Sequence, residues 1–188
     1  MTQKAASKRT YPWTTTIKDK EVSLRQMTAA DGDRILAFAR SLPEDDLLFM
    51  STDITKPEAV DFYVQSIKAG RIHVILAESE GRLVGYGNLM INELTWTRHL
   101  GEMQLMVAPE FRGKGLGQVL AGEVFVIAQE HGLQKIVARM AAEQRGAIQV
   151  FEKMGFRAEA LLADFVIDRR DRTHDLIVMT YDVTGLTE

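Results

Sequence analysis

The stretch VAPEFRGKGLGQVL, residues 107–120, joins a strand-like run to a helix-like run through a glycine-rich turn. Three glycines stand at alternate positions in this turn, with two cations among them: Gly113, Gly115, Gly117, Arg112 and Lys114. Glycine tolerates positive φ and lets the backbone approach a ligand closely. The first turn of a helix carries unpaired N–H groups and a partial positive charge. The stretch therefore predicts an anion site, most naturally for a phosphate or pyrophosphate.

The spacing of the glycines separates three known phosphate-binding loops. A P-loop needs Ser or Thr after its lysine, whereas Gly115 follows Lys114. The dinucleotide fingerprint needs a glycine three places after Gly115, where Gln118 stands instead. Residues 112–117 fit the third pattern, Arg/Gln-x-x-Gly-x-Gly/Ala, in full. This segment resembles the pyrophosphate-binding motif of the GCN-five-related N-acetyltransferase (GNAT) family, whose members hold acetyl-CoA.

Two further segments are similar to the same family. The phrase Met-Val-Ala-Pro at 106–109 resembles the one that precedes the family's motif, and AIQVFEKMGF at 147–156 resembles a later helix with a terminal Gly-Phe. The resemblance covers roughly residues 21–182. It implies an acyl-CoA N-acyltransferase (GNAT) fold and an acetyl-CoA-dependent N-acetyltransferase. The alternative is a purely structural turn, for which one glycine would suffice.

Hydrophobic periodicity, taken without the resemblance, predicts an α+β fold with α/β character. Strands are expected over residues 21–27, 73–79, 82–92, 101–108, 135–142, 160–168 and 175–183. Helices are expected over residues 33–42, 57–67, 115–130 and 145–154, and a loop over 43–56. This order matches the family's fold, a mixed, mostly antiparallel central sheet of about seven strands flanked by about four helices.

Composition narrows the classes of function. The chain has 188 residues, of which 46% are hydrophobic, and a net charge of −3. This size suits one core, and so weak a field does not indicate a nucleic-acid partner. The chain has no cysteine, which excludes disulfides and thiolate metal sites and fits a cytoplasmic protein. No apolar run approaches the roughly 20 residues of a membrane span, so no membrane partner is expected.

The domain prediction has two parts. Residues 1–19 are predicted as a loosely ordered N-terminal leader, which Tyr11 and Trp13 could dock and which lacks the apolar region of a secretory signal. Residues 20–188 are predicted as a single GNAT acetyltransferase domain. The four histidines are scattered without metal-ligand spacing, so no metal site is expected.

The resemblance also implies how acetyl-CoA is held. The backbone at Met106 and Val107 would pair with the pantetheine arm, and the amides of the glycine turn would cradle the pyrophosphate. The residues assigned to the cosubstrate in this way are Met106, Val107, Arg112, Gly113, Lys114, Gly115, Leu116, Gly117, Gln118, Gln144, Ala147 and Phe151.

Transfer to an amine needs a base for the amine and a proton for the leaving thiolate. Alternation along 101–108 sets Glu102 apart from the core face, so it is the candidate base, acting through water; it could equally be a solvated strand-end carboxylate. Glu93 and His99 are weaker alternatives. The family's usual proton-donating tyrosine falls at Phe151, which cannot donate a proton, so Tyr86 is the replacement considered.

The acceptor stays open at the level of sequence. A small-molecule amine is the first expectation, with a protein N-terminus or lysine as the alternative; the resemblance is compatible with a homodimer. The loop at 43–56 lies where the family often forms the acceptor wall, and Glu44, Asp45, Asp46 and Asp53 could attract a cationic amine or be solvated. Because of Phe151, a catalytically silent CoA-binding regulatory module is a second hypothesis, and a different nucleotide binder a third.

Overall fold

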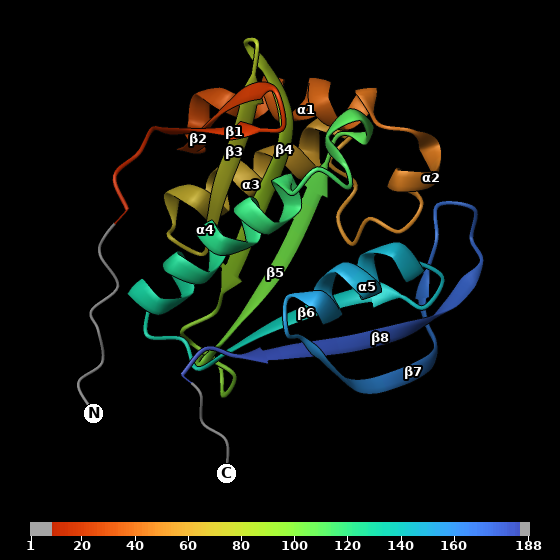
Figure 1. Ribbon diagram of the computed structural model, residues 1–188. Helices are drawn as coiled ribbons and strands as arrows, with labels where there is room; N and C mark the ends of the chain where they lie inside the picture. Colours follow the sequence, from red (N-terminus) through yellow and green to blue (C-terminus); the bar gives the residue numbers. More distant parts are fainter. Residues whose placement is uncertain (1–8, 185–188) are drawn as a thin grey trace. The chain divides into compact units, whose positions relative to one another are not determined.

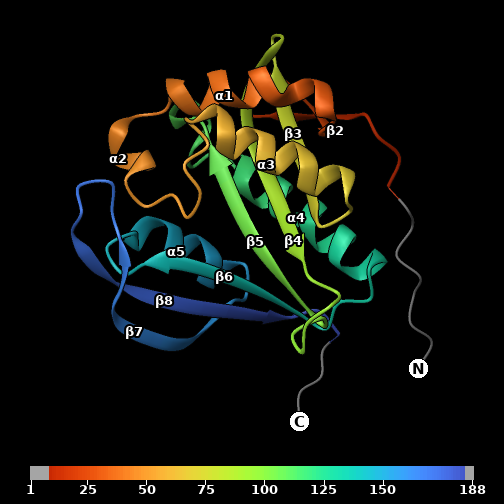
Figure 2. The same cartoon turned by 180° about the vertical axis from the view of Figure 1, so that it is seen from behind.

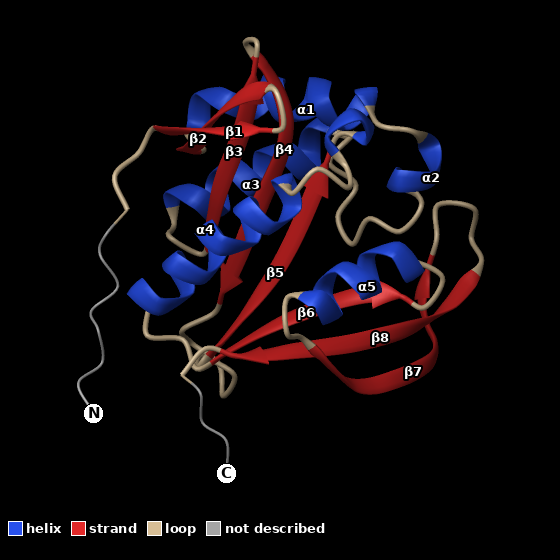
Figure 3. Cartoon of the chain, viewed as in Figure 1, coloured by secondary structure: helices blue, strands red, loops and turns tan. Residues whose placement is uncertain are grey.

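The structure, a computed structural model, describes residues 9–184 as an eight-stranded sheet with five α-helices (Figures 1 and 3). The strands are β1 Trp13–Ile17, β2 Lys20–Gln26, β3 Ile72–Ser79, β4 Arg82–Ile91, β5 Leu100–Val107, β6 Lys135–Ala141, β7 Arg157–Ile167 and β8 Thr173–Asp182. The helices are α1 Gly32–Ser41, α2 Glu44–Leu47, α3 Pro57–Lys68, α4 Leu116–Glu130 and α5 Arg145–Lys153. The strand order is β1-β2-β3-β4-β5-β6-β8-β7. This mixed, mostly antiparallel sheet confirms the predicted fold class.

The chain divides into two compact units. Among the described residues, the first unit comprises 9–27, 71–136 and 182–184, and the second comprises 28–70 and 137–181. The single domain predicted for residues 20–188 stays a prediction.

In the first unit, β1 to β5 pair antiparallel in chain order, and α4 packs on β4 and β5. Two glycines on β4 allow this close packing. A Cβ at Gly87 would lie 3.1 Å from the side chains of Leu105 and Val124, and one at Gly85 would lie 2.8 Å from the carbonyl oxygen of Met106. Side chains at these two positions would push α4 off the sheet, so the two glycines let α4 lie close against β4.

The second unit holds α1, α2, α3, α5, the β7–β8 hairpin and most of β6. Helices α1 and α3 pack together, with Gly32 against the Val60 side chain. Behind α5, three aromatic rings stack in sequence: Phe151 lies 4.9 Å from Phe156, which lies 5.6 Å from Tyr181, measured between ring centroids. These rings anchor α5 to the end of β8 and the start of β7.

The N-terminal arm, residues 9–13, is fixed to a buried carboxylate on α4. Glu123 is 1% exposed, and Arg9 forms an ion pair with its Oε1 at 3.0 Å. The Tyr11 hydroxyl and the Trp13 indole N–H donate to Oε2 at 2.6 and 3.2 Å. Burial, and then the bond to Glu123, raise the pKa of the Tyr11 phenol well above its ordinary range, so it stays a neutral donor. Docking by Tyr11 and Trp13 is thus confirmed.

Two expectations need correction. The loosely ordered leader predicted over residues 1–19 is wrong for 13–17, which form the edge strand β1 and supply the eighth strand; residues 1–8 lie outside the described part. The loop predicted over 43–56 contains a short helix, α2. A four-residue helix shows too little periodicity to be recognised, and the Thr-rich β1 has an exposed face without apolar alternation.

Candidate functional site

The glycine turn forms as the sequence predicts, directly before α4. Gly113 and Gly115 have φ of 64° and 98°, and Gly115 is the N-cap of the helix. A Cβ at either position would meet nothing within 4 Å, so open space borders the turn. The carbonyl of Gly115 accepts the N–H groups of Gln118 and Val119 at 3.1 and 3.2 Å. The amides that precede these two have no intrahelical acceptor by helix geometry, and they are the groups an anion could use.

The two cations of the turn differ in their surroundings. Arg112 donates from its Nε to the carbonyl oxygen of Val107 at 3.0 Å, which ties the turn back to the end of β5. Lys114 is exposed. Leu116 is fully buried, whereas Gly117 has only Val107 near it, at 3.9 Å from an added Cβ. Thus Arg112 stabilises the turn, Leu116 anchors the helix, and Lys114 is the cation with freedom to meet a ligand.

Register places the candidate catalytic residues on one face of the β4–β5 pair. Tyr86 lies opposite Met106, Asn88 opposite Gln104, and Met90 opposite Glu102. Side chains directly opposite one another share a face, and this face is the reverse of the one that meets α4. The Asn88 amide donates to the Gln104 oxygen at 3.3 Å.

The same register separates Glu102 from Tyr86. Along β5, Glu102 and the residue opposite Tyr86 are four positions apart, which corresponds to about 13 Å at roughly 3.3 Å per residue. Tyr86 is 3% exposed, and Glu102 is half-buried. The two side chains therefore share a face but start from well-separated backbone positions along it.

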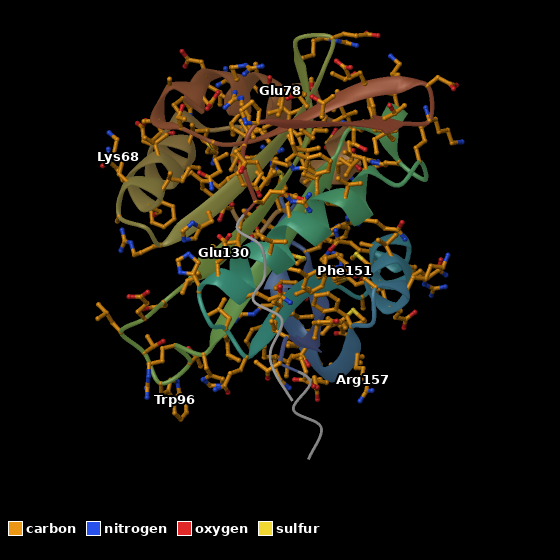
Figure 4. All side chains as sticks on the ribbon, turned by 60° about the vertical axis from the view of Figure 1, so that its left-hand side comes forward. Lys68, Glu78, Trp96, Glu130, Phe151 and Arg157 are labelled. Atoms are coloured by element: carbon orange, nitrogen blue, oxygen red, sulfur yellow. The ribbon has the colours of Figure 1, made fainter. Side chains whose placement is uncertain are left out.

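The weaker base candidates, Glu93 and His99, lie in the loop between β4 and β5 and are both exposed. The backbone carbonyl of His99 accepts the N–H groups of Gln134 and Lys135 at 2.9 and 3.3 Å. Trp96 in this loop is 89% exposed and points away from the protein (Figure 4). Nothing in the geometry of this loop gathers the groups that a proton-transfer site needs.

The three remaining cosubstrate candidates belong to the second unit. Gln144 precedes α5, and its Oε1 accepts the N–H of Ala141 at 2.9 Å, which caps the end of β6. Ala147 lies within α5 and is half-buried. Phe151, also in α5, is buried against Phe156. Packing thus accounts for Phe151, and a role of these three in binding acetyl-CoA stays a prediction.

Two of the acidic residues of the segment 43–56 are paired with arginines of the same chain. Arg170 forms an ion pair with Glu44 at 2.9 Å, and Arg169 forms one with Asp53 at 3.0 Å. The hydrogen bond from Arg170 lowers the pKa of the Glu44 carboxyl. Burial opposes ionisation of Asp53, but hydrogen bonds from Thr55 and Arg169 outweigh it and lower the pKa of this carboxyl as well. The negative charges of these two carboxylates are therefore compensated by arginines of the same chain. The sequence missed both arginines because they are more than a hundred residues away along the chain.

Among residues 9–184, no group of three or more His, Cys, Asp or Glu side chains is arranged to hold a metal ion. Within the same residues, no helix is long and apolar enough to cross a membrane.

Comparison with known proteins supplies the family. The model of the "Acetyltransferase (GNAT) family" matches residues 39–156. A spermidine N(1)-acetyltransferase of Vibrio cholerae is 29% identical over 101 residues, which are 51% of this chain and 56% of that protein. The chain thus aligns with little more than half the length of this curated relative.

Two solved structures share the fold. A ribosomal-protein-alanine N-acetyltransferase from Brucella melitensis superposes with a TM-score of 0.72 at 24% identity, over 85% of this chain and 98% of that chain. A spermidine N-acetyltransferase from Vibrio cholerae, in complex with CoA and spermine, superposes with a TM-score of 0.71 at 20% identity, over 87% of this chain and 96% of that chain.

Proposed function

Because the chain belongs to the acetyltransferase (GNAT) family, we propose that it is an N-acetyltransferase that uses acetyl-CoA and acetylates a primary amine. The observation that carries the proposal is the turn at Gly113 and Gly115, whose positive φ values lead into the first turn of α4 beside open space. The cytoplasm is the proposed location. A homodimer is compatible with the proposal.

The residues of the turn fit the pyrophosphate of CoA. The amides at the start of α4 would bind its oxygens, and Lys114 would add a charge at the rim. The backbone of Met106 and Val107 at the end of β5 would pair with the amide-rich pantetheine arm as an added strand would. We assign Gln144, Ala147 and Phe151 to the same ligand on the family resemblance alone.

Acetyl-CoA would supply the activated acetyl group, which the amine takes by direct attack on the thioester carbonyl. An amine is mostly protonated near neutral pH, with a pKa of about 8 for an α-amino group and about 10.4 for lysine. We assign the removal of that proton to Glu102, through water. The leaving thiolate, with a thiol pKa of about 8.5, either departs as the anion or takes a proton from Tyr86.

A small-molecule amine is the proposed acceptor, since the curated relative named above acetylates spermidine. The pairing of Glu44 and Asp53 with arginines argues against strong attraction of a polycation by this segment. We therefore expect an acceptor with fewer positive charges than a polyamine. A protein N-terminus or lysine is the alternative acceptor; the structural neighbour from Brucella melitensis is named for a protein acceptor.

A silent CoA-binding module is the second candidate function, and the observation in its favour is Phe151. This residue stands at the family's tyrosine position and packs into the aromatic stack. Such a module would bind acetyl-CoA but release no CoA thiol when a broad panel of amines is added.

Calorimetric titration with acetyl-CoA tests the proposal, with ATP and NAD as controls. Micromolar binding of acetyl-CoA without binding of either control supports it. Absence of acetyl-CoA binding overturns it, and binding without thiol release on any amine leaves only the module.

A further inference from the structure

The turn between β7 and β8 is organised around a buried carboxylate, Asp168. Its Oδ1 accepts the backbone N–H groups of Arg170 and Arg172 at 2.7 and 3.0 Å. Its Oδ2 accepts the Arg172 Nε–H at 3.0 Å and lies 2.8 Å from His174 Nε2. Burial opposes ionisation here, but these hydrogen bonds outweigh it and hold the pKa of Asp168 well below its ordinary range. Asp168 is therefore a fixed negative charge that shapes the turn.

His174 bridges two carboxylates. Its Nδ1 lies 2.8 Å from Glu143, and its Nε2 lies 2.8 Å from Asp168. A neutral imidazole has one N–H and can donate to only one of them, so both bonds require the imidazolium. The bonds to Glu143 and then to Asp168 raise the pKa of His174. The other charged group at this bridge, Arg172, is itself paired with Asp168.

The same turn holds the segment 43–56 at three points. Arg170 pairs with Glu44 near the start of the segment, at 2.9 Å. The Phe49 ring packs edge-on against His174 with 5.0 Å between centroids. Near the end, Arg169 donates to Asp53 and to the Thr55 hydroxyl, both at 3.0 Å. Both ribbon views place the β7–β8 turn beside α2 (Figures 1 and 2).

We infer that the charged His174, seated between Glu143 and Asp168, is a positioning residue that orders the segment 43–56 and thereby sets the KM for the amine acceptor. This inference rests on the proposed function, in which that segment forms the acceptor wall. Loss of the proton removes one of the two hydrogen bonds of His174, so the imidazole is no longer held in place against the Phe49 ring. The middle of the segment then becomes less ordered. The two arginine pairs keep its ends in place.

The sign of the pH dependence follows from the direction of the shift. Because the pKa of His174 is raised in the folded chain, its contribution is complete below the ordinary histidine value of about 6.5 and is lost as the pH rises through the raised value. The segment is therefore most ordered on the acidic side and loosens toward alkaline pH.

Hydrogen–deuterium exchange of the whole chain tests the inference without any ligand. Between about pH 6 and about pH 9, and after correction for intrinsic exchange, wild-type protection of 43–56 should fall with rising pH. His174→Gln should lack this protection throughout. His131→Gln, which alters an exposed histidine of the first unit, should behave as wild type.

Glu143→Gln gives a second measurement if His174→Gln does not fold. Glu143 is half exposed, and its amide can still accept from His174 while lacking the charge that raises the histidine pKa. The midpoint of the protection curve should therefore move to lower pH.

Kinetics then link the segment to the reaction. His174→Gln should raise the acceptor KM several-fold and leave the acetyl-CoA Kd unchanged. Protection that does not depend on pH, an unmoved midpoint in Glu143→Gln, or an unchanged acceptor KM despite lost protection overturns the inference. If wild type neither binds acetyl-CoA nor turns over, the proposed function fails, and the exchange measurement still decides whether His174 orders the segment.

Discussion

At the scale of single residues, the separation of Glu102 and Tyr86 along β5 determines how their catalytic roles are tested. Glu102 and Tyr86 share a face, and their backbone positions lie about 13 Å apart along β5, so each is assigned to a different proton of the reaction. Each must therefore be judged by its own pH signature, and a base and an acid affect opposite limbs of a pH–rate profile.

Glu102→Gln should lower kcat/KM by about 10²-fold and remove the acidic limb of its pH profile, because the amide cannot accept the proton. The acetyl-CoA Kd should not change. Glu130→Gln, which also removes one carboxylate but at an exposed site, serves as the control. The companion variant Tyr86→Phe should alter only the alkaline limb. An acidic limb that persists in Glu102→Gln would remove that residue from the mechanism.

At the scale of elements, the start of α4 tests the cosubstrate site. Gly117→Glu should weaken acetyl-CoA binding by more than about 100-fold, or about 2.7 kcal/mol, since it puts bulk and negative charge beside the amides that would meet the pyrophosphate. Gly117 is a cleaner position than Gly115, whose φ of 98° would strain any side chain. Calorimetry provides the affinity and a thermal melt confirms folding.

Gly122→Glu is the matched control for this variant. It makes the same substitution further along α4, where an added Cβ meets nothing within 4 Å, while one at Gly117 meets only Val107 at 3.9 Å. Its acetyl-CoA affinity should equal that of wild type. Equal affinities for Gly117→Glu and Gly122→Glu would move the anion site away from the glycine turn.

Most elements could be predicted from the sequence because their apolar residues recur at regular spacing. The apolar stripe from Leu116 to Ile127, with Gly115 before it, predicted the bounds of α4 to within one residue. The glycine turn could likewise be predicted, because its conformation depends on residues adjacent in sequence. Helix α2 was not predicted because four residues are too few to show a helical periodicity. Strand β1 was not predicted because its exposed threonines do not alternate with apolar residues.

At the scale of the whole molecule, pairings distant in sequence were beyond prediction. Arg170 and Glu44 are separated by 126 positions, and Tyr11 and Glu123 by 112. Local sequence patterns identify polar and charged side chains but not which of them pair, because the pairing depends on the complete topology. The same limit applies to His174, which in the sequence is only one of four scattered histidines.

The N-terminal arm should contribute measurably to global stability. Tyr11→Phe removes a hydrogen bond to a buried carboxylate and should lower the free energy of unfolding by about 1.5–3 kcal/mol in urea titration. Thr10→Ala, at an exposed neighbouring position, should change it by less than about 0.5 kcal/mol. Equal stabilities of the two variants would show that Arg9 and Trp13 alone satisfy Glu123.

This arm also has a consequence for the order of events during translation. Arg9, Tyr11 and Trp13 are synthesised more than a hundred residues before their carboxylate partner on α4. Until then the arm has no docking site in the nascent chain. Domains acquire structure as they emerge, at about 5–20 residues per second, so the arm waits several seconds. The arm can therefore dock only after α4 has been synthesised.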